Sequence, residues 1–317
     1  MDEFLIQVTH LYYQRNMNQS EIARLLNVSK MTVSRALKKA QDVGLVTITV
    51  NLPVKHDEQL SHRLKKVLQL QDAFVVKVPS FSEPSSDAQD AAISLGEAAA
   101  FFLDPLLQDG MVIGVAVGST VGQVARSLHR KELPNATVVQ LIGGLGKSSD
   151  HDPYNIVQSV SERLGAHGIY FTGPAFVASP EILEAMKVEN SMRGFPELWK
   201  RCDLCLVGIG TCEPTVPFVT SGLVDADELR RLCELGAVGD LLGRYYRIDG
   251  TSIDNDLHER VNAIPIDTLR GVKNVVLVAG GLNKVEAIIG ASRIHFPFTL
   301  ITDEVTARAV LASKYLN

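Results

Sequence analysis

The sequence predicts an α/β protein in which a small helical unit precedes a much larger unit built on a parallel sheet. In the first fifty positions, apolar residues recur at helical spacing between residues that favour helix ends. Further along, continuous apolar runs alternate with helical stretches, as expected for a sheet that is covered on both faces. The 317 residues exceed the usual size of one domain, which agrees with this division.

Three helices are expected in the N-terminal unit. The first spans residues 2–15, and the second follows Asn18, whose side chain can cap the helix while Glu21 reaches back to it. Met17 and Ile22 stand at the two positions of a hydrophobic staple. Asn27 ends this short helix, because asparagine tolerates the left-handed conformation that a sharp turn requires.

The third helix begins after Ser29, a good N-cap residue, and runs to about Val43, with Gly44 placed to end it. Its predicted buried face consists of Val33, Ala36, Leu37 and Ala40. The opposite face is mostly polar and basic. Residues 45–50 then alternate as a strand, which suits the wing of a winged helix-turn-helix domain.

A helix, a four-residue turn and a second helix with a polar and basic outer face form the geometry that places the second helix in the major groove of DNA. The alternative is a plain three-helix bundle with a solvated basic face. The residues expected to contact DNA are Gln19, Ser29, Lys30, Met31, Thr32, Ser34, Arg35, Lys38 and Lys39.

The charge distribution supports the DNA-binding interpretation. Residues 1–55 contain seven lysines and arginines and four acidic residues, which gives a net charge of +3. The whole chain carries −5, so residues 56–317 carry −8. A basic unit attached to an acidic one is typical of a module that binds a polyanion.

Pro53 interrupts the pattern, and we expect the domain boundary near residue 55, which gives an N-terminal domain of residues 1–55 and a C-terminal domain of residues 56–317. Shortly after it, the residues Leu60, Leu64, Val67 and Leu68 share one face of a short helix, a candidate connector or dimer contact. A polar loop is expected at residues 79–86 and a long helix at 87–103.

The larger unit is predicted to be a Rossmann-like parallel sheet with strands at 74–78, 111–117, 137–142, 204–209, 275–279 and 299–302. In such sheets ligands bind beyond the carboxyl ends of the strands. Glycines cluster at these ends, in 118–120, 143–144, 208–210 and 280–281.

Two of these glycine-containing turns are candidate phosphate sites. Gly118 with Ser119 and Thr120 leads from a strand into a helix, whose exposed amides and dipole favour an anion. Gly281 precedes a helix in the same way, and Lys284 adds a cation. Either turn could use glycine simply to change direction. Neither matches the Walker A or the dinucleotide motif, so ATP and NAD are disfavoured and no cofactor is expected.

Asp240 is a candidate for binding sugar hydroxyls, because a carboxylate can accept from two at once; the alternatives are a helix cap or a surface charge. Cys202 and Cys205 form a C-x-x-C motif, but a spacing of three in a strand places the thiols on opposite faces. We therefore expect these cysteines to pack in the core and expect no metal site.

The whole chain resembles the sorbitol/deoxyribonucleoside-regulator (SorC/DeoR-type) family of bacterial sugar-responsive transcription factors. The N-terminal motifs that carry the resemblance are 11–13, 22–29 and 32–35. Those in the larger unit are 118–120, 140–144, 237–240 and 279–281 with Lys284. Their order and spacing together are specific, although each motif is short.

The resemblance implies a winged helix-turn-helix joined to an effector domain like the sugar-phosphate isomerases and deaminases. It also implies a phosphorylated sugar or polyol as effector and a tetramer built from dimers. By position, Ser119, Thr120 and Lys284 would hold the phosphate, and Asp240 would face the sugar. Gly143 and Gly144 would let the ligand approach the backbone.

These observations predict a cytoplasmic DNA-binding transcriptional regulator of a carbohydrate or polyol catabolic operon. Its expected partners are double-stranded operator DNA, a small sugar, polyol or sugar-phosphate effector, and further copies of the chain in a dimer or tetramer. No apolar run is long enough to span a membrane. The alternative is a sugar-phosphate isomerase or deaminase with a DNA-binding head, which would need a general base beside the substrate carbonyl. Activation and repression both stay open.

Overall fold

The computed structural model describes residues 3–46, 55–77, 87–146, 151–189 and 192–316. The chain divides into two compact units, Met1–Pro53 and Val54–Asn317, which we call the N-terminal and C-terminal units. None of the helices within the described ranges has the length and apolar character needed to cross a membrane.

The N-terminal unit consists of helices packed around a small apolar core. Helix α1 (Glu3–Thr9) continues into a π-helical turn (His10–Gln14), followed by α2 (Gln19–Leu25) and α3 (Lys30–Asp42). The buried residues of this core are Leu5, Val8, Ile22, Ala23, Val33, Ala36, Leu37 and Ala40. This set confirms the predicted buried face of α3. Most of the predicted wing, residues 47–50, lies outside the described residues, while Leu45 and Val46 are not in a strand.

The helix ends in this unit form as predicted. The Asn18 carboxamide oxygen accepts hydrogen bonds from the amides of Ser20 and Glu21, each at 3.0 Å, and the Glu21 carboxylate accepts from the Asn18 amide at 2.8 Å. Asn27 has a positive φ of 51°, and Gly44 has a φ of 72°. These local contacts fix the turn between α2 and α3.

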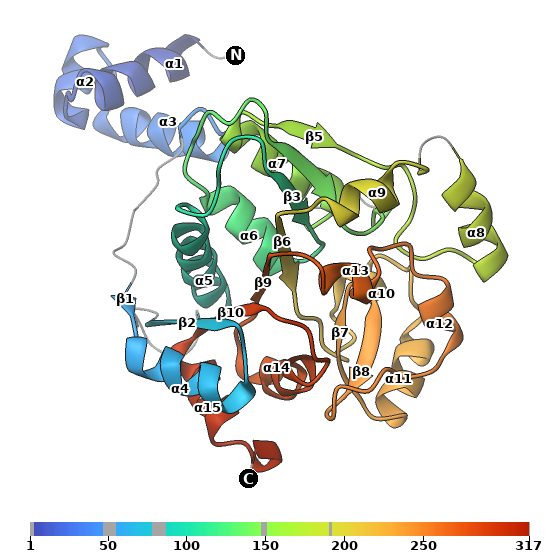
Figure 1. The fold of residues 1–317 in the computed structure, drawn as a ribbon. Coiled ribbons are helices and arrows are strands. Elements are labelled where there is room, and N and C mark those ends of the chain that lie inside the picture. Colours follow the sequence, from blue (N-terminus) through green and yellow to red (C-terminus); the bar gives the residue numbers. More distant parts are fainter. Residues whose placement is uncertain (1–2, 47–54, 78–86, 147–150, 190–191, 317) are drawn as a thin grey trace. The chain divides into compact units, whose positions relative to one another are not determined.

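The C-terminal unit is built on one eight-stranded sheet (Figure 1). Its strands in spatial order are β1 (Lys55–His56), β2 (Asp72–Lys77), β10 (Thr299–Asp303), β9 (Asn274–Val278), β6 (Leu204–Gly208), β3 (Val112–Val115), β4 (Thr137–Gln140) and β5 (His167–Ile169). Only β1 runs antiparallel to its neighbour; the other pairs are parallel. The predicted α/β class and all six predicted strands are confirmed.

Helices cover both faces of this sheet. Successive strand residues point to opposite faces, so Ile113 and Val115 pack in one core and Val112 in the other. On the first face lie α5 (Asp87–Leu103), α6 (Ser119–Ser127) and α7 (Pro153–Leu164). On the second lie α4 (Glu58–Leu68), α14 (Val285–Ser292) and α15 (Glu304–Leu311).

The remaining elements flank the sheet on one side of the unit (Figure 1). They include an antiparallel hairpin of β7 (Ala237–Leu241) and β8 (Arg244–Arg247). The helices here are α8 (Pro180–Val188), α9 (Phe195–Lys200), α10 (Pro217–Thr220), α11 (Ala226–Glu234), α12 (Asp256–Glu259) and α13 (Ile266–Leu269). Neither this hairpin nor the short strands β1 and β5 was predicted.

The order of the strands reverses between β3 and β6. From β3 the chain proceeds outward to β4 and β5, whereas from β6 it proceeds the other way to β9 and β10. Connections that diverge in this manner leave a crevice at the carboxyl ends of the two strands, the usual ligand position in open α/β sheets.

Two sequence-based expectations are wrong. Leu60, Leu64 and Leu68 of α4 are buried in the core of their own unit, so the helix does not present them as a connector or dimer contact; Val67 alone of that group is exposed. The second wrong expectation is that the two thiols of the C-x-x-C motif lie on opposite faces of a strand; both cysteines pack in the same core. Cys202 precedes β6, and a hydrogen bond with its thiol, together with burial, raises the pKa of Cys205.

The core-packing interpretation of both cysteines is nevertheless correct, since both are buried. Across the described residues, no group of three or more His, Cys, Asp or Glu side chains is arranged to hold a metal ion.

Candidate functional site

The first candidate site is the outer face of α3. Its predicted contact residues Lys30, Met31, Thr32, Ser34, Arg35, Lys38 and Lys39 are all exposed, as is the N-cap residue Ser29, whereas Gln19 at the start of α2 is half-buried. The Ser29 hydroxyl accepts a hydrogen bond from the Thr32 amide at 3.1 Å and lies 2.8 Å from the Thr32 hydroxyl. These contacts cap the N-terminal turn of the helix, the part that reaches base edges in helix-turn-helix proteins.

The charge of this face is available to a ligand. Within the described ranges, neither Arg35 nor Lys38 forms an ion pair. Met31 is 63% exposed, although methionine is apolar. An apolar side chain beside basic ones matches the mixed surface of the DNA major groove, with its phosphates, base edges and thymine methyl groups.

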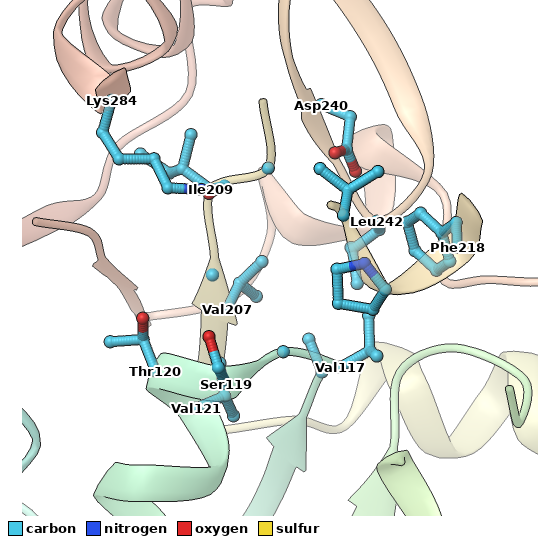
Figure 2. Close-up of a pocket in the computed structure, with 16 residues that line it drawn as sticks. Val117, Ser119, Thr120, Val121, Val207, Ile209, Phe218, Asp240, Leu242 and Lys284 are labelled. Atoms are coloured by element: carbon cyan, nitrogen blue, oxygen red, sulfur yellow. Dashed lines mark hydrogen bonds between the residues drawn. The ribbon is translucent and has the colours of Figure 1, made fainter. Parts of the chain in front are cut away.

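The second candidate site is a pocket at the crevice between β3 and β6 (Figure 2). It has a volume of about 600 Å³ with its open mouth included. The pocket is lined by Ala116–Val121 after β3, Val207–Gly210 at the end of β6, Val216–Phe218, Asp240 and Leu242 of the hairpin, and Lys284.

One wall of the pocket is the N-terminus of α6. Gly118 precedes the helix with a φ of 130°, and no side chain caps it. Over the described part of the chain, the amides of Ser119 and Thr120 have no acceptor. Figure 2 shows both hydroxyl side chains directed toward the space below Lys284. Unpaired amides at the positive end of a helix dipole attract an anion.

Asp240 lies on the opposite side of the pocket (Figure 2). It is on β7 and only 4% exposed, so its alternative interpretations as a helix cap or surface charge are wrong. One carboxylate oxygen accepts the Gly243 amide at 2.9 Å. Burial raises the pKa of Asp240 to about 6, and the Gly243 hydrogen bond and the Lys284 charge only partly offset this rise. A ligand hydroxyl would replace the solvation that this carboxylate has lost.

The hairpin turn holds Asp240 in place. Its two central residues, Leu242 and Gly243, have positive φ values of 55° and 78°, as the tight turn of a hairpin requires. Leucine rarely adopts this conformation, and its side chain is buried against the pocket. Sequence reasoning missed Leu242 because the usual Asn-Gly or Asp-Gly signal is absent.

Lys284 brings a cation to the same pocket. Its Nζ donates a hydrogen bond to the Ile209 carbonyl at 2.7 Å, and burial lowers its pKa. That single backbone contact positions the ammonium group and leaves further donors for a ligand. The glycines after β6 were noted in the sequence, but Ile209 and Gly210 were not predicted as site residues.

The structure does not bring the other predicted glycines into this pocket. The Gly281 amide is bonded to Asp303 and Thr306, at 3.2 and 2.7 Å. The Gly143 amide donates to the Asn262 carbonyl, and the residue packs directly against Pro174, while the Gly144 amide donates to Gly173. Contact of these three glycines with an effector stays a prediction.

Replacing Asp240 by asparagine is expected to stabilise the ligand-free protein at pH 7. Between its ordinary pKa of 3.8 and about 6, Asp240 is protonated when folded and ionised when unfolded, so rising pH removes stability over this window. Two pKa units correspond to about 3 kcal/mol, and the pKa of about 6 already includes the attraction between Asp240 and Lys284. Asparagine can still accept the Gly243 hydrogen bond.

Chemical denaturation of both proteins at pH 4 and pH 7 tests this prediction. The difference in unfolding free energy should be near zero at the lower pH and about 1–3 kcal/mol in favour of Asp240→Asn at the higher pH. An equal difference at both values would show that the ionisation of Asp240 is not responsible.

Together, a helix-turn-helix with a basic outer face and a ligand pocket in a separate unit define a DNA-binding transcriptional regulator with a small-molecule sensor. Residues 52–312 match the model of the Sugar-bind family of sugar-binding domains, and residues 6–49 match that of the MarR family. The chain belongs to the Sugar-bind family, because that model covers most of its length.

Full-length relatives agree with this assignment. The chain is 29% identical to the deoxyribonucleoside regulator of Bacillus subtilis, over 96% of each protein. It is 27% identical to the erythritol catabolism regulatory protein EryD of Brucella abortus, over 98% of this chain and 96% of that one. The crystal structure of the full-length sorbitol operon regulator SorC from Klebsiella pneumoniae superimposes with a TM-score of 0.72 at 26% identity, covering 97% of this chain and 98% of SorC. The resemblance to SorC/DeoR-type regulators is therefore confirmed.

Proposed function

We propose that this protein controls a carbohydrate or polyol catabolic operon and that a small phosphorylated sugar or polyol in the β3–β6 pocket sets its affinity for operator DNA. We assign residues 1–55 to the DNA-binding domain and residues 56–317 to a Rossmann-like effector and oligomerisation domain; the wing stays a prediction. The relatives are named for deoxyribonucleosides, erythritol catabolism and the sorbitol operon, and these names support the chemical class proposed for the effector.

The observation that carries this proposal is the division of the pocket into two chemical ends. The α6 amides and Lys284 form a positive end that suits a phosphate. Asp240, on the other side, is an acceptor for the hydroxyls of a sugar or polyol. We assign effector contacts to Gly118, Ser119, Thr120, Asp240 and Lys284.

On DNA, the exposed face of α3 supplies the contacts, with Arg35 and Lys38 as its central cations. Two or four subunits would place these helices in half-sites about one helical turn apart, or a multiple of it. Effector binding that changes operator affinity roughly 5–150-fold would require about 1–3 kcal/mol of coupling.

We further propose that the protein is not an enzyme. Of the described residues that line the pocket, Asp240 is the only carboxylate, and none is a histidine. Isomerisation or deamination of a sugar phosphate needs a general base and a general acid at the reacting group. Because Lys284 is assigned to the phosphate in this proposal, Asp240 has no acid partner in the lining. Turnover of any member of a panel of pentose and hexose phosphates by the purified protein would overturn this part of the proposal.

A thermal-shift screen of the full chain tests the effector assignment. Sugar and polyol phosphates should raise the melting temperature, since a ligand at 100 times its Kd adds about 2.7 kcal/mol of stability, and the unphosphorylated parents should do less. Lys284→Gln should abolish the preference for the phosphorylated form. An equal response to both forms in the wild type would contradict the phosphate assignment while leaving the DNA-binding assignment intact.

A further inference from the structure

A second cavity lies in the C-terminal unit, away from the β3–β6 pocket. It has a volume of about 1190 Å³ with its open mouth included, and its walls come from α8, α9, α12, α13, β8 and residues 261–265. Figure 1 shows these elements on the side of the unit that carries the hairpin. The two pockets share no lining residue. The ligand proposed for the β3–β6 pocket therefore does not account for this cavity.

Arg244 is the unusual group in this cavity. Its guanidinium donates to the carbonyls of Ile264 and Ala263, at 3.0 and 3.2 Å, which leaves the other N–H donors for a further partner. Among the described residues, no carboxylate lies within ion-pair distance of it. Burial lowers the pKa of Arg244 to about 10, still far above neutrality, so the group is a cation with no anion. Partly buried charges are ordinarily paired.

The neighbouring charges do not supply the missing anion. Lys187 is paired with Glu184, and Lys200 is paired with Glu197 at 2.6 Å. Glu259 lines the cavity but is exposed to solvent. The Nε2 atom of His258 accepts a hydrogen bond from the Tyr245 amide. Burial, and to a smaller extent the charge of Arg244, lowers the pKa of His258 to about 4, so its ring is neutral at pH 7. Among the described residues that line the cavity, Arg244 is therefore the one half-buried charge that no ion pair compensates.

The wall near α9 is apolar and firmly held. Trp199 is buried and donates its indole N–H to the Gln140 carbonyl at 2.7 Å. Leu183, Met192 and Pro196 line the same cavity. An apolar wall beside one oriented cation is the composition of a small-molecule site, in which a few polar groups set orientation.

We propose that this cavity binds a small organic carboxylate, whose carboxylate pairs with Arg244 and whose apolar body packs against Trp199. A single uncompensated charge matches a monoanion, and the planar guanidinium matches the two oxygens of a carboxylate. The site is independent of the proposed effector pocket: Asp240 and Leu242 of the hairpin line that pocket, whereas Arg244 lines this one.

Phenylacetate is the probe for this site, and phenylacetamide, which has the same shape but no charge, is its control. Trp199 is the only tryptophan of the chain, so its fluorescence reports on this cavity. Titration of the full-length protein with phenylacetate should change that fluorescence and give a binding isotherm by calorimetry. Phenylacetamide should bind at least tenfold more weakly.

Two matched variants separate ligand binding from structural support. Arg247, on the same strand, also donates to two backbone carbonyls, those of Leu235 and Ser252, but it does not line the cavity. Arg244→Gln should weaken phenylacetate binding roughly 10- to 100-fold, whereas Arg247→Gln should leave it unchanged. Arg244→Lys should recover part of the affinity, and melting curves establish that each variant is folded.

Several results would overturn the proposal. These are no binding of phenylacetate at millimolar concentration, equal affinity for phenylacetamide, unchanged binding by a folded Arg244→Gln variant, or binding without a response of Trp199. Failure of the sugar-phosphate screen would not affect this test, because its readout and its residues are separate.

Discussion

Replacing Arg35 by alanine is expected to abolish sequence-specific DNA binding while the protein stays folded. The side chain is exposed on α3, and among the described residues it makes no ion pair, so its loss should hardly change stability. A bidentate arginine contact to a base contributes about 1–3 kcal/mol of discrimination. With one such helix on each of two half-sites, the loss doubles to about 2–6 kcal/mol, which removes most of the advantage over non-specific DNA.

The measurement is a mobility shift on duplexes that the wild-type protein selects from a random-sequence pool, with melting temperature as the check on folding. Arg270→Ala provides the control, because Arg270 is also exposed but lies on the C-terminal unit, where it pairs with Asp267. Operator affinity that survives in a folded Arg35→Ala variant would refute the assignment of α3 as the reading helix.

Replacing Gly210 by alanine is expected to remove the response to the effector. Gly210 and Asp240 exchange backbone hydrogen bonds, from the Gly210 amide at 2.9 Å and from the Asp240 amide at 3.3 Å. A methyl group on Gly210 would overlap the Asp240 carboxylate, which would have to rotate away and lose its hydrogen bond to Gly243. We expect about 1–3 kcal/mol of destabilisation from overpacking and roughly 10- to 100-fold weaker effector binding.

Gly194→Ala is the matched control, because a methyl group there would meet no atom within 4 Å. Calorimetry with the best ligand from the thermal-shift screen measures the affinity, and denaturation measures the stability. Operator binding without ligand should be retained in both variants, since Gly210 belongs to the other unit. Wild-type ligand affinity in Gly210→Ala would show that Asp240 does not contact the effector.

Local signals in the sequence predicted the N-terminal unit well. The capping of α2 by Asn18, the turn at Asn27 and the start of α3 at Ser29 each depend on residues within four positions of one another. Contacts of this range can be inferred from residue type alone, because the backbone itself brings the partners together. The apolar runs of the six strands were equally clear, since strands buried on both faces consist mostly of apolar residues.

Tertiary contacts account for what the sequence did not predict. The leucines of α4 would form the same sequence pattern whether they packed in the core of their own unit or against a partner. Only the packing of α4 against β2 shows that they belong to the core. The hairpin of β7 and β8 has a leucine at a left-handed position and no familiar turn signal. The separation of Gly143 and Gly144 from the pocket likewise depends on their packing against residues 173–174, which are distant in sequence.

The burial of Asp240 has a practical consequence for anyone who would convert this protein into a biosensor. Substitutions chosen for thermostability alone would favour a neutral residue at position 240, because the ionised carboxylate is costly in the empty pocket. Such a sensor would be durable but insensitive to the hydroxyl pattern of its analyte. Stabilising substitutions should instead be placed at surface positions and helix ends. The unfavourable burial of the ionised Asp240 carboxylate is then kept, and binding of the analyte can relieve it.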